Sequence, residues 1–107
     1  MIGIGTDLVD IERFRRSLER TPGLRDRLFR PDEQAYADQR GDPVERYASR
    51  FAAKEAALKA LGLGLGGMPM YDIEVVRAKS GAPSLLLHGK AAETAASAGV
   101  TEWLITI

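Results

Sequence analysis

A stretch in the middle of the chain decides the fold, and it reads Arg50-Phe51-Ala52-Ala53-Lys54-Glu55-Ala56-Ala57-Leu58-Lys59-Ala60-Leu61. It has no Gly or Pro and five alanines, so it predicts a helix, which we extend back to about Val44. At 100° per residue, Arg50 and Lys54 share one edge, while Glu55 and Lys59 share another. The Phe and Leu side chains lie between these edges. The opposite side of the helix carries only small side chains, so a strand or another helix can pack closely against it. Its residues are Ala52, Ala53, Ala56 and Ala60.

The position of these charges has two interpretations. Charges that flank large apolar side chains indicate that some of them border a cleft, because a surface helix normally separates the two kinds of residue. The alternative is a set of surface charges, in which Glu55 and Lys59 form an i,i+4 pair that contributes about 0.3–0.5 kcal/mol.

A glycine-rich run follows the helix, Gly62-Leu63-Gly64-Leu65-Gly66-Gly67. Repeated glycine costs backbone entropy, so the run indicates a chain that turns closely around a ligand, such as a phosphate held by backbone N–H groups. The alternative for Gly62 is a helix C-cap.

The composition is that of an ordinary globular protein of 107 residues, with 45% hydrophobic and 28% charged residues and a formal net charge of zero. We expect one domain over residues 1–107. Cysteine is absent, which excludes disulfides and thiol chemistry. Because we find neither an apolar segment of membrane-spanning length nor a signal peptide, we expect a cytoplasmic protein with no membrane contact.

Positive charge is concentrated between Glu12 and Arg30, where the sequence has seven arginines and three acidic residues. A solvated helix, an acidic protein partner and a nucleic acid each fit such a cluster. No DNA- or RNA-binding signature accompanies it, so we expect no nucleic-acid partner.

The remaining sequence predicts further helices over residues 11–20, 24–29, 32–39 and 89–98, and strands over residues 2–9, 71–78, 84–88 and 101–107. This order predicts an α+β fold in which helices cover one face of a small, antiparallel-type sheet. Asp7 falls near the end of the first strand, on the face that Gly3 and Gly5 leave clear. His88 has no partner suited to metal binding or base chemistry nearby in sequence, so we interpret it as structural.

Three segments together resemble one family. They are Gly3-Ile4-Gly5-Thr6-Asp7-Leu8-Val9-Asp10, then Arg50 to Ala60 with Gly62 and Gly64, and then Asp72-Ile73-Glu74-Val75 with Gly81-Ala82-Pro83 and Leu87-His88-Gly89. The chain is similar to the small bacterial holo-[acyl-carrier-protein] synthases, which are 4′-phosphopantetheinyl transferases.

The resemblance implies an enzyme of fatty-acid biosynthesis that transfers the 4′-phosphopantetheine group of coenzyme A to a serine of apo acyl carrier protein, releasing 3′,5′-ADP. It also implies Mg²⁺ and a homotrimer with active sites between subunits. Mg²⁺ typically takes one or two carboxylates together with phosphate oxygens, so two acids beside several cations suit this chemistry.

Residue by residue, the resemblance makes Asp7 and Glu55 the metal ligands, and Asp7, Glu55 and Lys59 the catalytic residues. The positions that it implies for coenzyme A binding are Arg50, Lys54, Lys59, Gly62 and Gly64. The positions that it implies for carrier-protein binding are Arg13, Arg16 and Arg20. The general base stays open between Glu55, Asp7 and a metal-bound water.

The chain departs from the family pattern at Ile107, beyond which relatives continue with a turn and a further strand. Two other functions therefore stay open. One is a non-catalytic module that binds coenzyme A or a nucleotide phosphate, and the other is an Arg-rich interaction domain in which Asp7 and Glu55 are structural.

Overall fold

The computed structural model describes residues 3–64 and 67–107. Met1 and Ile2, at the start of the first expected strand, and Leu65 and Gly66, in the glycine-rich run, lie outside the described residues. The elements in chain order are α1 (Ile11–Arg20), α2 (Leu24–Leu28), α3 (Pro31–Ala37), α4 (Val44–Ala60), the 3₁₀ turn η1 (Met70–Asp72), β1 (Ile73–Arg77), β2 (Pro83–Leu87) and α5 (Gly89–Ser97). No described helix is long and apolar enough to cross a membrane.

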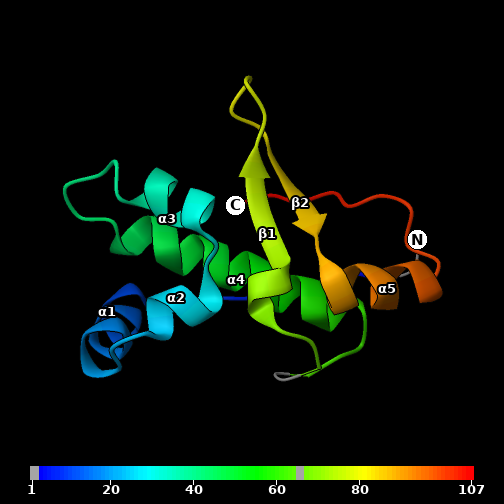
Figure 1. Ribbon diagram of the computed structural model, residues 1–107, viewed down its shortest axis with the longest axis horizontal. Coiled ribbons are helices and arrows are strands. Elements are labelled where there is room, and N and C mark those ends of the chain that lie inside the picture. The colour runs from blue at the N-terminus through cyan, green and yellow to red at the C-terminus, as the bar shows by residue number, and fades with distance from the viewer. Residues whose placement is uncertain (1–2, 65–66) are drawn as a thin grey trace.

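Helix α4 crosses the middle of the molecule, with α1, α2 and α3 toward one end and the β1–β2 hairpin and α5 toward the other (Figure 1). Two hydrophobic clusters form along it. The first contains Phe14, Phe29, Ala37, Val44, Tyr47 and Ala48, and the second contains Ala57, Leu58, Met68, Met70, Ile73 and Ala91. Phe51 packs against both clusters, so α4 connects them.

The helix boundaries follow from local chemistry. The Asp10 carboxylate accepts a hydrogen bond from the backbone N–H of Arg13 at 3.0 Å and so begins α1. Helix α4 ends in a Schellman motif, in which Leu63 N–H donates to Leu58 C=O at 2.8 Å and Gly62 adopts φ +74°. The C-cap interpretation of Gly62 is therefore confirmed.

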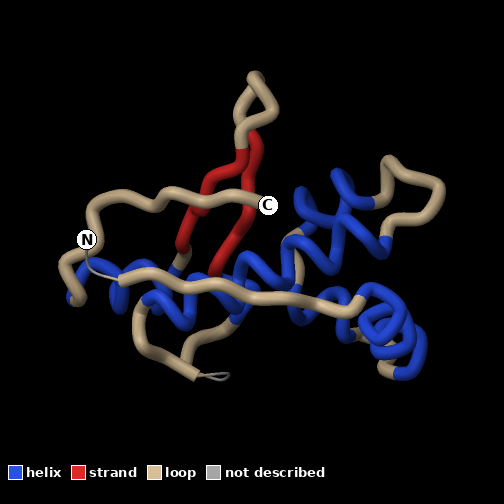
Figure 2. Tube along the Cα trace, turned by 180° about the vertical axis from the view of Figure 1, so that it is seen from behind, coloured by secondary structure: helices blue, strands red, loops and turns tan. Residues whose placement is uncertain are grey.

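The hairpin confirms the antiparallel sheet of the expected α+β fold, with Ile73 opposite Leu87 and Arg77 opposite Pro83. The other two expected strands are wrong. In the described part of the chain, residues 3–9 and 101–107 form no sheet ladder; they run as extended chain along the back of the molecule (Figure 2). Their alternating sequences suit a strand, but in the described chain only β1 and β2 pair with each other.

The first of these segments lies against α4 through its two glycines. A Cβ atom added to Gly3 would overlap the carbonyl oxygen of Ala60, and one added to Gly5 would overlap that of Ala56. Two residues of extended chain advance about 6.6 Å and four helical residues advance about 6 Å. The two glycines, two residues apart, therefore contact two alanines that are four residues apart on α4. The expectation that the alanine side of α4 admits a closely packed segment is confirmed.

Candidate active site

Asp7, Lys59 and Glu55 form a cluster where the N-terminal segment passes α4. Lys59 Nζ lies 2.8 Å from Asp7 Oδ1 and also donates to the carbonyl oxygen of Thr6 at 3.0 Å. The Asp7 side chain is only 10% exposed, whereas Lys59 keeps about half of its side chain in solvent. The hydrogen bond to Asp7 raises the pKa of Lys59, so its ammonium stays charged.

Glu55 lies half-buried beside this ion pair. Burial raises the pKa of Glu55 first, the Asp7 carboxylate raises it further, and Lys59 lowers it. The net direction of the pKa is upward, with burial as the largest cause and repulsion from Asp7 as the second. The structure therefore brings together the three residues expected to do the catalysis, although they come from positions far apart in the chain.

The two neighbouring carboxylates bear on the expected Mg²⁺. No group of three or more His, Cys, Asp or Glu residues in the described part of the chain forms a metal-binding set. Two carboxylates fit Mg²⁺ nevertheless, because this ion is commonly held by one or two carboxylates while substrate phosphates and water supply its other ligands. Asp7 and Glu55 would hold the ion, and its charge would offset both the burial of Glu55 and the repulsion from Asp7 that raise the pKa of Glu55.

Lys54 lies in a different environment, inside the protein. Its side chain is completely buried, and its ammonium donates to Glu33 Oε1 at 2.8 Å, Leu28 O at 2.8 Å and Met70 O at 2.9 Å. These bonds use all three N–H donors of a lysine. Glu33 also accepts from the backbone N–H of Val75 at 3.0 Å. The pair joins α3, α4 and β1, so its surroundings favour a structural role for Lys54 over the expected contact with coenzyme A.

Arg50 is also buried, in a cluster of guanidinium groups around one aromatic ring. The guanidinium carbons of Arg46, Arg50 and Arg77 lie 3.9, 4.2 and 5.0 Å from the ring centroid of Tyr36. Burial lowers the pKa of Arg50, and the neighbouring Arg77 adds to this effect. Arg50 Nε is the one buried side-chain nitrogen or oxygen of the described residues that lacks a hydrogen-bond partner. This guanidinium cluster is rich in donors and lacks a carboxylate partner for Arg50.

The guanidinium cluster is separate from the Asp7 cluster within one chain. Arg50 and Lys59 are nine residues apart on α4, which places them about 13 Å apart along the axis and about half a turn apart around it. Reasoning from sequence missed Tyr36, Arg46 and Arg77. The i,i+4 spacing of Arg46 and Arg50 is a weak signal, but nothing local connects them with a tyrosine on α3 or an arginine at the end of β1.

The other expected positions are open to solvent. A Cβ atom added to Gly62 or Gly64 would meet nothing within 4 Å, so neither glycine is needed for close packing inside the chain. Arg13, Arg16 and Arg20 are all exposed on α1. His88 Nε2 lies 2.7 Å from Glu74 Oε1 across the hairpin, which gives this histidine a structural partner.

Two carboxylates beside a lysine ammonium in an α+β fold suit a protein that handles phosphate groups, because phosphoryl transfer depends on positioning and on neutralising charge. Residues 3–107 match the family model of the 4′-phosphopantetheinyl transferase superfamily, and the chain belongs to this family.

Known members are similar over most of their length. The holo-[acyl-carrier-protein] synthase of Clavibacter michiganensis is 52% identical over 99 residues, covering 92% of this chain and 77% of that protein. The synthase of Moorella thermoacetica is 43% identical over 107 residues, covering 100% of this chain and 84% of that protein. The structure of Helicobacter pylori holo-[acyl-carrier-protein] synthase in complex with coenzyme A superimposes with a TM-score of 0.79 at 27% identity, covering 92% of this chain and 83% of the other.

Proposed function

We propose that this protein transfers the 4′-phosphopantetheine group of coenzyme A to a serine hydroxyl of an apo acyl carrier protein. The serine oxygen attacks the phosphorus that bears the pantetheine arm, and the bond from that phosphorus to the bridging oxygen breaks. The products are holo acyl carrier protein and 3′,5′-ADP, and the serine proton passes to a base. The observation that carries the proposal is the Asp7–Glu55–Lys59 cluster in a chain that matches the transferase family from residue 3 to residue 107.

Each residue of the cluster has a role in this proposal. Asp7 and Glu55 would hold Mg²⁺, which supplies Lewis-acid stabilisation of the diphosphate when bound. Lys59 neutralises negative charge on the phosphate oxygens, because its ammonium is anchored by Asp7 yet half exposed. The base that takes the serine proton stays open between Glu55, Asp7 and a metal-bound water.

The guanidinium cluster supports a second contact with coenzyme A. Arg50 retains an unused N–H group, and Arg46 and Arg77 add positive charge around the same ring. A diphosphate is too short to reach both this cluster and Lys59 on opposite sides of α4 in one chain. We therefore propose that the two clusters act on one ligand only when neighbouring subunits supply one cluster each, in the homotrimer that the resemblance implies. The fatty-acid role implied by the same resemblance and the cytoplasmic location expected from the sequence complete the proposal.

Intact-mass spectrometry of an apo acyl carrier protein tests the function directly. Incubation with coenzyme A, Mg²⁺ and the protein should raise the carrier mass by one 4′-phosphopantetheine group, and 3′,5′-ADP should appear in equal amount. The Glu55→Gln variant should form the adduct at least about 100-fold more slowly. The matched control is Glu45→Gln, an exposed glutamate of the same helix, which should react as the unmodified protein does.

The competing function is a module that binds coenzyme A without transferring any part of it. Calorimetric binding of coenzyme A together with an unchanged carrier mass would favour this module over the transferase. The proposal fails if a correctly folded protein binds coenzyme A and shows no adduct with carrier in excess.

A further inference from the structure

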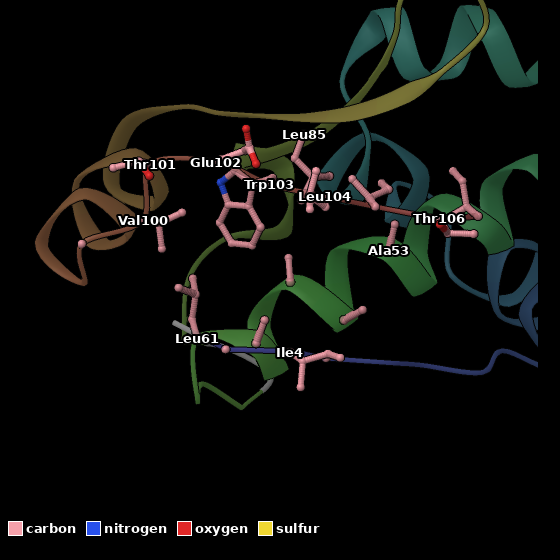
Figure 3. Close-up of a pocket in the computed structure, with 18 residues that line it drawn as sticks. Ile4, Ala53, Leu61, Leu85, Val100, Thr101, Glu102, Trp103, Leu104 and Thr106 are labelled. Carbon is pink, nitrogen blue, oxygen red and sulfur yellow. The ribbon is translucent and has the colours of Figure 1, made fainter. Parts of the chain in front are cut away.

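Neighbouring residues of α4 face different parts of the molecule. Ala53 lines the apolar groove drawn in Figure 3, whereas Glu55 lies beside Asp7. Lys54, between them in sequence, is buried in the interior, where its ammonium contacts Glu33 of α3. A change at Lys54 can therefore act on the junction of α3, α4 and β1 without removing any group of the Asp7 cluster.

The junction is built from hydrogen bonds that use both carboxylate oxygens of Glu33. Oε1 accepts from Lys54 Nζ at 2.8 Å and from the backbone N–H of Arg30 at 2.9 Å. Oε2 accepts from the backbone N–H of Val75 at 3.0 Å. One buried carboxylate thus holds the lysine of α4 on one oxygen and the backbone of β1 on the other.

The bond to Val75 occupies the open edge of β1. Ala78 N–H donates to Ala82 C=O at 3.0 Å across the hairpin. Hydrogen-bonded residues alternate along an antiparallel pair, so Val75, three residues before Ala78, turns its N–H away from β2 and toward Glu33. Apolar packing has no preferred direction, whereas this hydrogen bond fixes where β1 lies along α3.

The junction and the guanidinium cluster are built on the same three elements. Each member of the junction is one step along its own element from a member of the cluster. The three steps are Glu33 to Tyr36 on α3, Lys54 to Arg50 on α4 and Val75 to Arg77 on β1. A helical turn advances about 5.4 Å and two strand residues advance about 6.6 Å, so the junction and the cluster form adjacent layers.

The guanidinium cluster does little by itself to hold β1 in place. Arg46 donates to Tyr36 C=O at 2.6 Å, which joins α4 to α3. Arg77 donates within its own hairpin to Gly81 C=O, and among the described residues no hydrogen bond joins it to α3 or α4. It lies 5.0 Å from the centre of the Tyr36 ring, beside Arg50, whose like charge repels it. The position of Arg77 therefore depends on support from outside the cluster.

We propose that Lys54 and Glu33 are positioning residues for the guanidinium cluster. Their ion pair fixes β1 against α3 and α4, so that Arg77 meets Arg50 at the Tyr36 ring and the cluster can bind a phosphate group of coenzyme A. This inference rests on the proposed function, in which the cluster contacts coenzyme A. A role in stability alone explains the pair less well, because a buried ion pair often adds little stability over apolar residues of the same volume.

Nuclear magnetic resonance tests the positioning without any activity assay. Glu33→Gln keeps the shape of the side chain, but an amide cannot accept hydrogen bonds at both of its ends. Nuclear Overhauser contacts between Arg77 and the Tyr36 ring should then weaken or vanish. Contacts between Arg46 and the same ring should persist, because Arg46 bonds directly to α3, and they serve as the internal control.

Calorimetry tests the consequence for binding. Arg77→Ala is the reference, and Glu33→Gln should weaken coenzyme A binding by a similar factor, about tenfold or about 1.4 kcal/mol. The KM for coenzyme A should rise, while kcat and the KM for the carrier should change by less than about twofold. The control is Ala95→Gly, a buried position on α5 outside the junction and the cluster, which should lower the Tm and leave binding unchanged.

A double variant separates positioning from stability. Lys54→Met combined with Glu33→Met replaces the pair by apolar side chains of similar length. Its Tm should exceed that of Lys54→Met alone, because no charge stays buried without a partner. It still lacks the bond to Val75, so it should bind coenzyme A as weakly as Glu33→Gln does.

Persistence of the contact between Arg77 and Tyr36 in folded Glu33→Gln or in the double variant would overturn the inference. Normal coenzyme A binding by these variants, with weak binding by Arg77→Ala, would also overturn it. If neither variant folds, the pair serves stability and the inference is wrong. Unchanged binding by Arg77→Ala would refute the contact of the cluster with coenzyme A and this inference with it, while the mass of the carrier would still decide the transfer.

Discussion

At position 55 a carboxylate lies half-buried beside the carboxylate of Asp7, with one ammonium for both. The folded state therefore holds the proton on Glu55 more tightly than the unfolded chain does. Above the unfolded pKa of about 4.3 this raised pKa costs stability, and the cost disappears as pH falls through the folded pKa, because the native carboxyl takes up its proton first. The ionised Glu55 side chain therefore lowers the free energy of unfolding at neutral pH.

We expect Glu55→Gln to lower the rate of carrier modification by about 100-fold or more while leaving the protein slightly more stable. The Tm at pH 7 should rise by a few degrees at most, and the difference from the unmodified protein should shrink as pH falls toward 4. Calorimetry across pH measures this, with Glu45→Gln as the control. A lower Tm for Glu55→Gln at pH 7 would show that the carboxylate stabilises the fold.

Among the elements, the contact between the N-terminal segment and α4 depends most closely on residue size. We expect Gly5→Ala to destabilise the protein by about 1–3 kcal/mol, since its Cβ would overlap the backbone of Ala56 and push the segment away. The shift should also carry Asp7 away from Lys59 and reduce the transfer rate. Urea unfolding of Gly5→Ala and Gly41→Ala checks this, because Gly41 has nothing within 4 Å and should change stability by less than about 0.5 kcal/mol.

Helix α1 presents Arg13, Arg16 and Arg20 to solvent, and the expectation that they meet an acidic carrier protein stays a prediction. Arg13→Glu and Arg16→Glu should each raise the KM for the carrier severalfold without changing coenzyme A affinity. The difference should shrink at high salt, because exposed charges are screened. Arg40→Glu, in a loop outside α1, is the control for net charge. Carrier kinetics that stay unchanged in both α1 variants would make these arginines a solvated helix face.

Sequence patterns predicted the helices and the hairpin because caps, prolines and apolar spacing are local signals, as at Asp10 and Gly62. They failed for residues 3–9 and 101–107. Apolar and polar residues alternate there as in a strand, but the described chain forms no sheet ladder in either segment. In the site, Asp7, Glu55 and Lys59 came from the resemblance, and the structure places them together. The buried partners of Lys54 could not be predicted, because Glu33 and Met70 meet it only through long-range packing.

At the scale of the whole molecule, one chain leaves the Asp7 cluster and the guanidinium cluster on opposite sides of α4 and several large apolar side chains in solvent, Leu8 and Leu104 among them. Exposed apolar groups in a small domain favour association. We expect a homotrimer, with a light-scattering mass of about three times 11.6 kDa at micromolar concentration. Mixing an Arg50→Ala chain with a Lys59→Ala chain should then restore part of the activity that each lacks alone. An active monomer would contradict the shared site.

The buried Lys54–Glu33 pair has a consequence for amine chemistry. Lys59, Lys79 and Lys90 are exposed, whereas the Lys54 amine is sealed between α3, α4 and β1. An acylating reagent should therefore modify three lysines within minutes and Lys54 only when that junction opens. Its modification rate, followed by peptide mapping, should track global unfolding and rise steeply with urea. Acylation of Lys54 at the pace of Lys79 would mean that the junction opens in the native state. The acylation rate of Lys54 therefore reports how often the junction between α3, α4 and β1 opens.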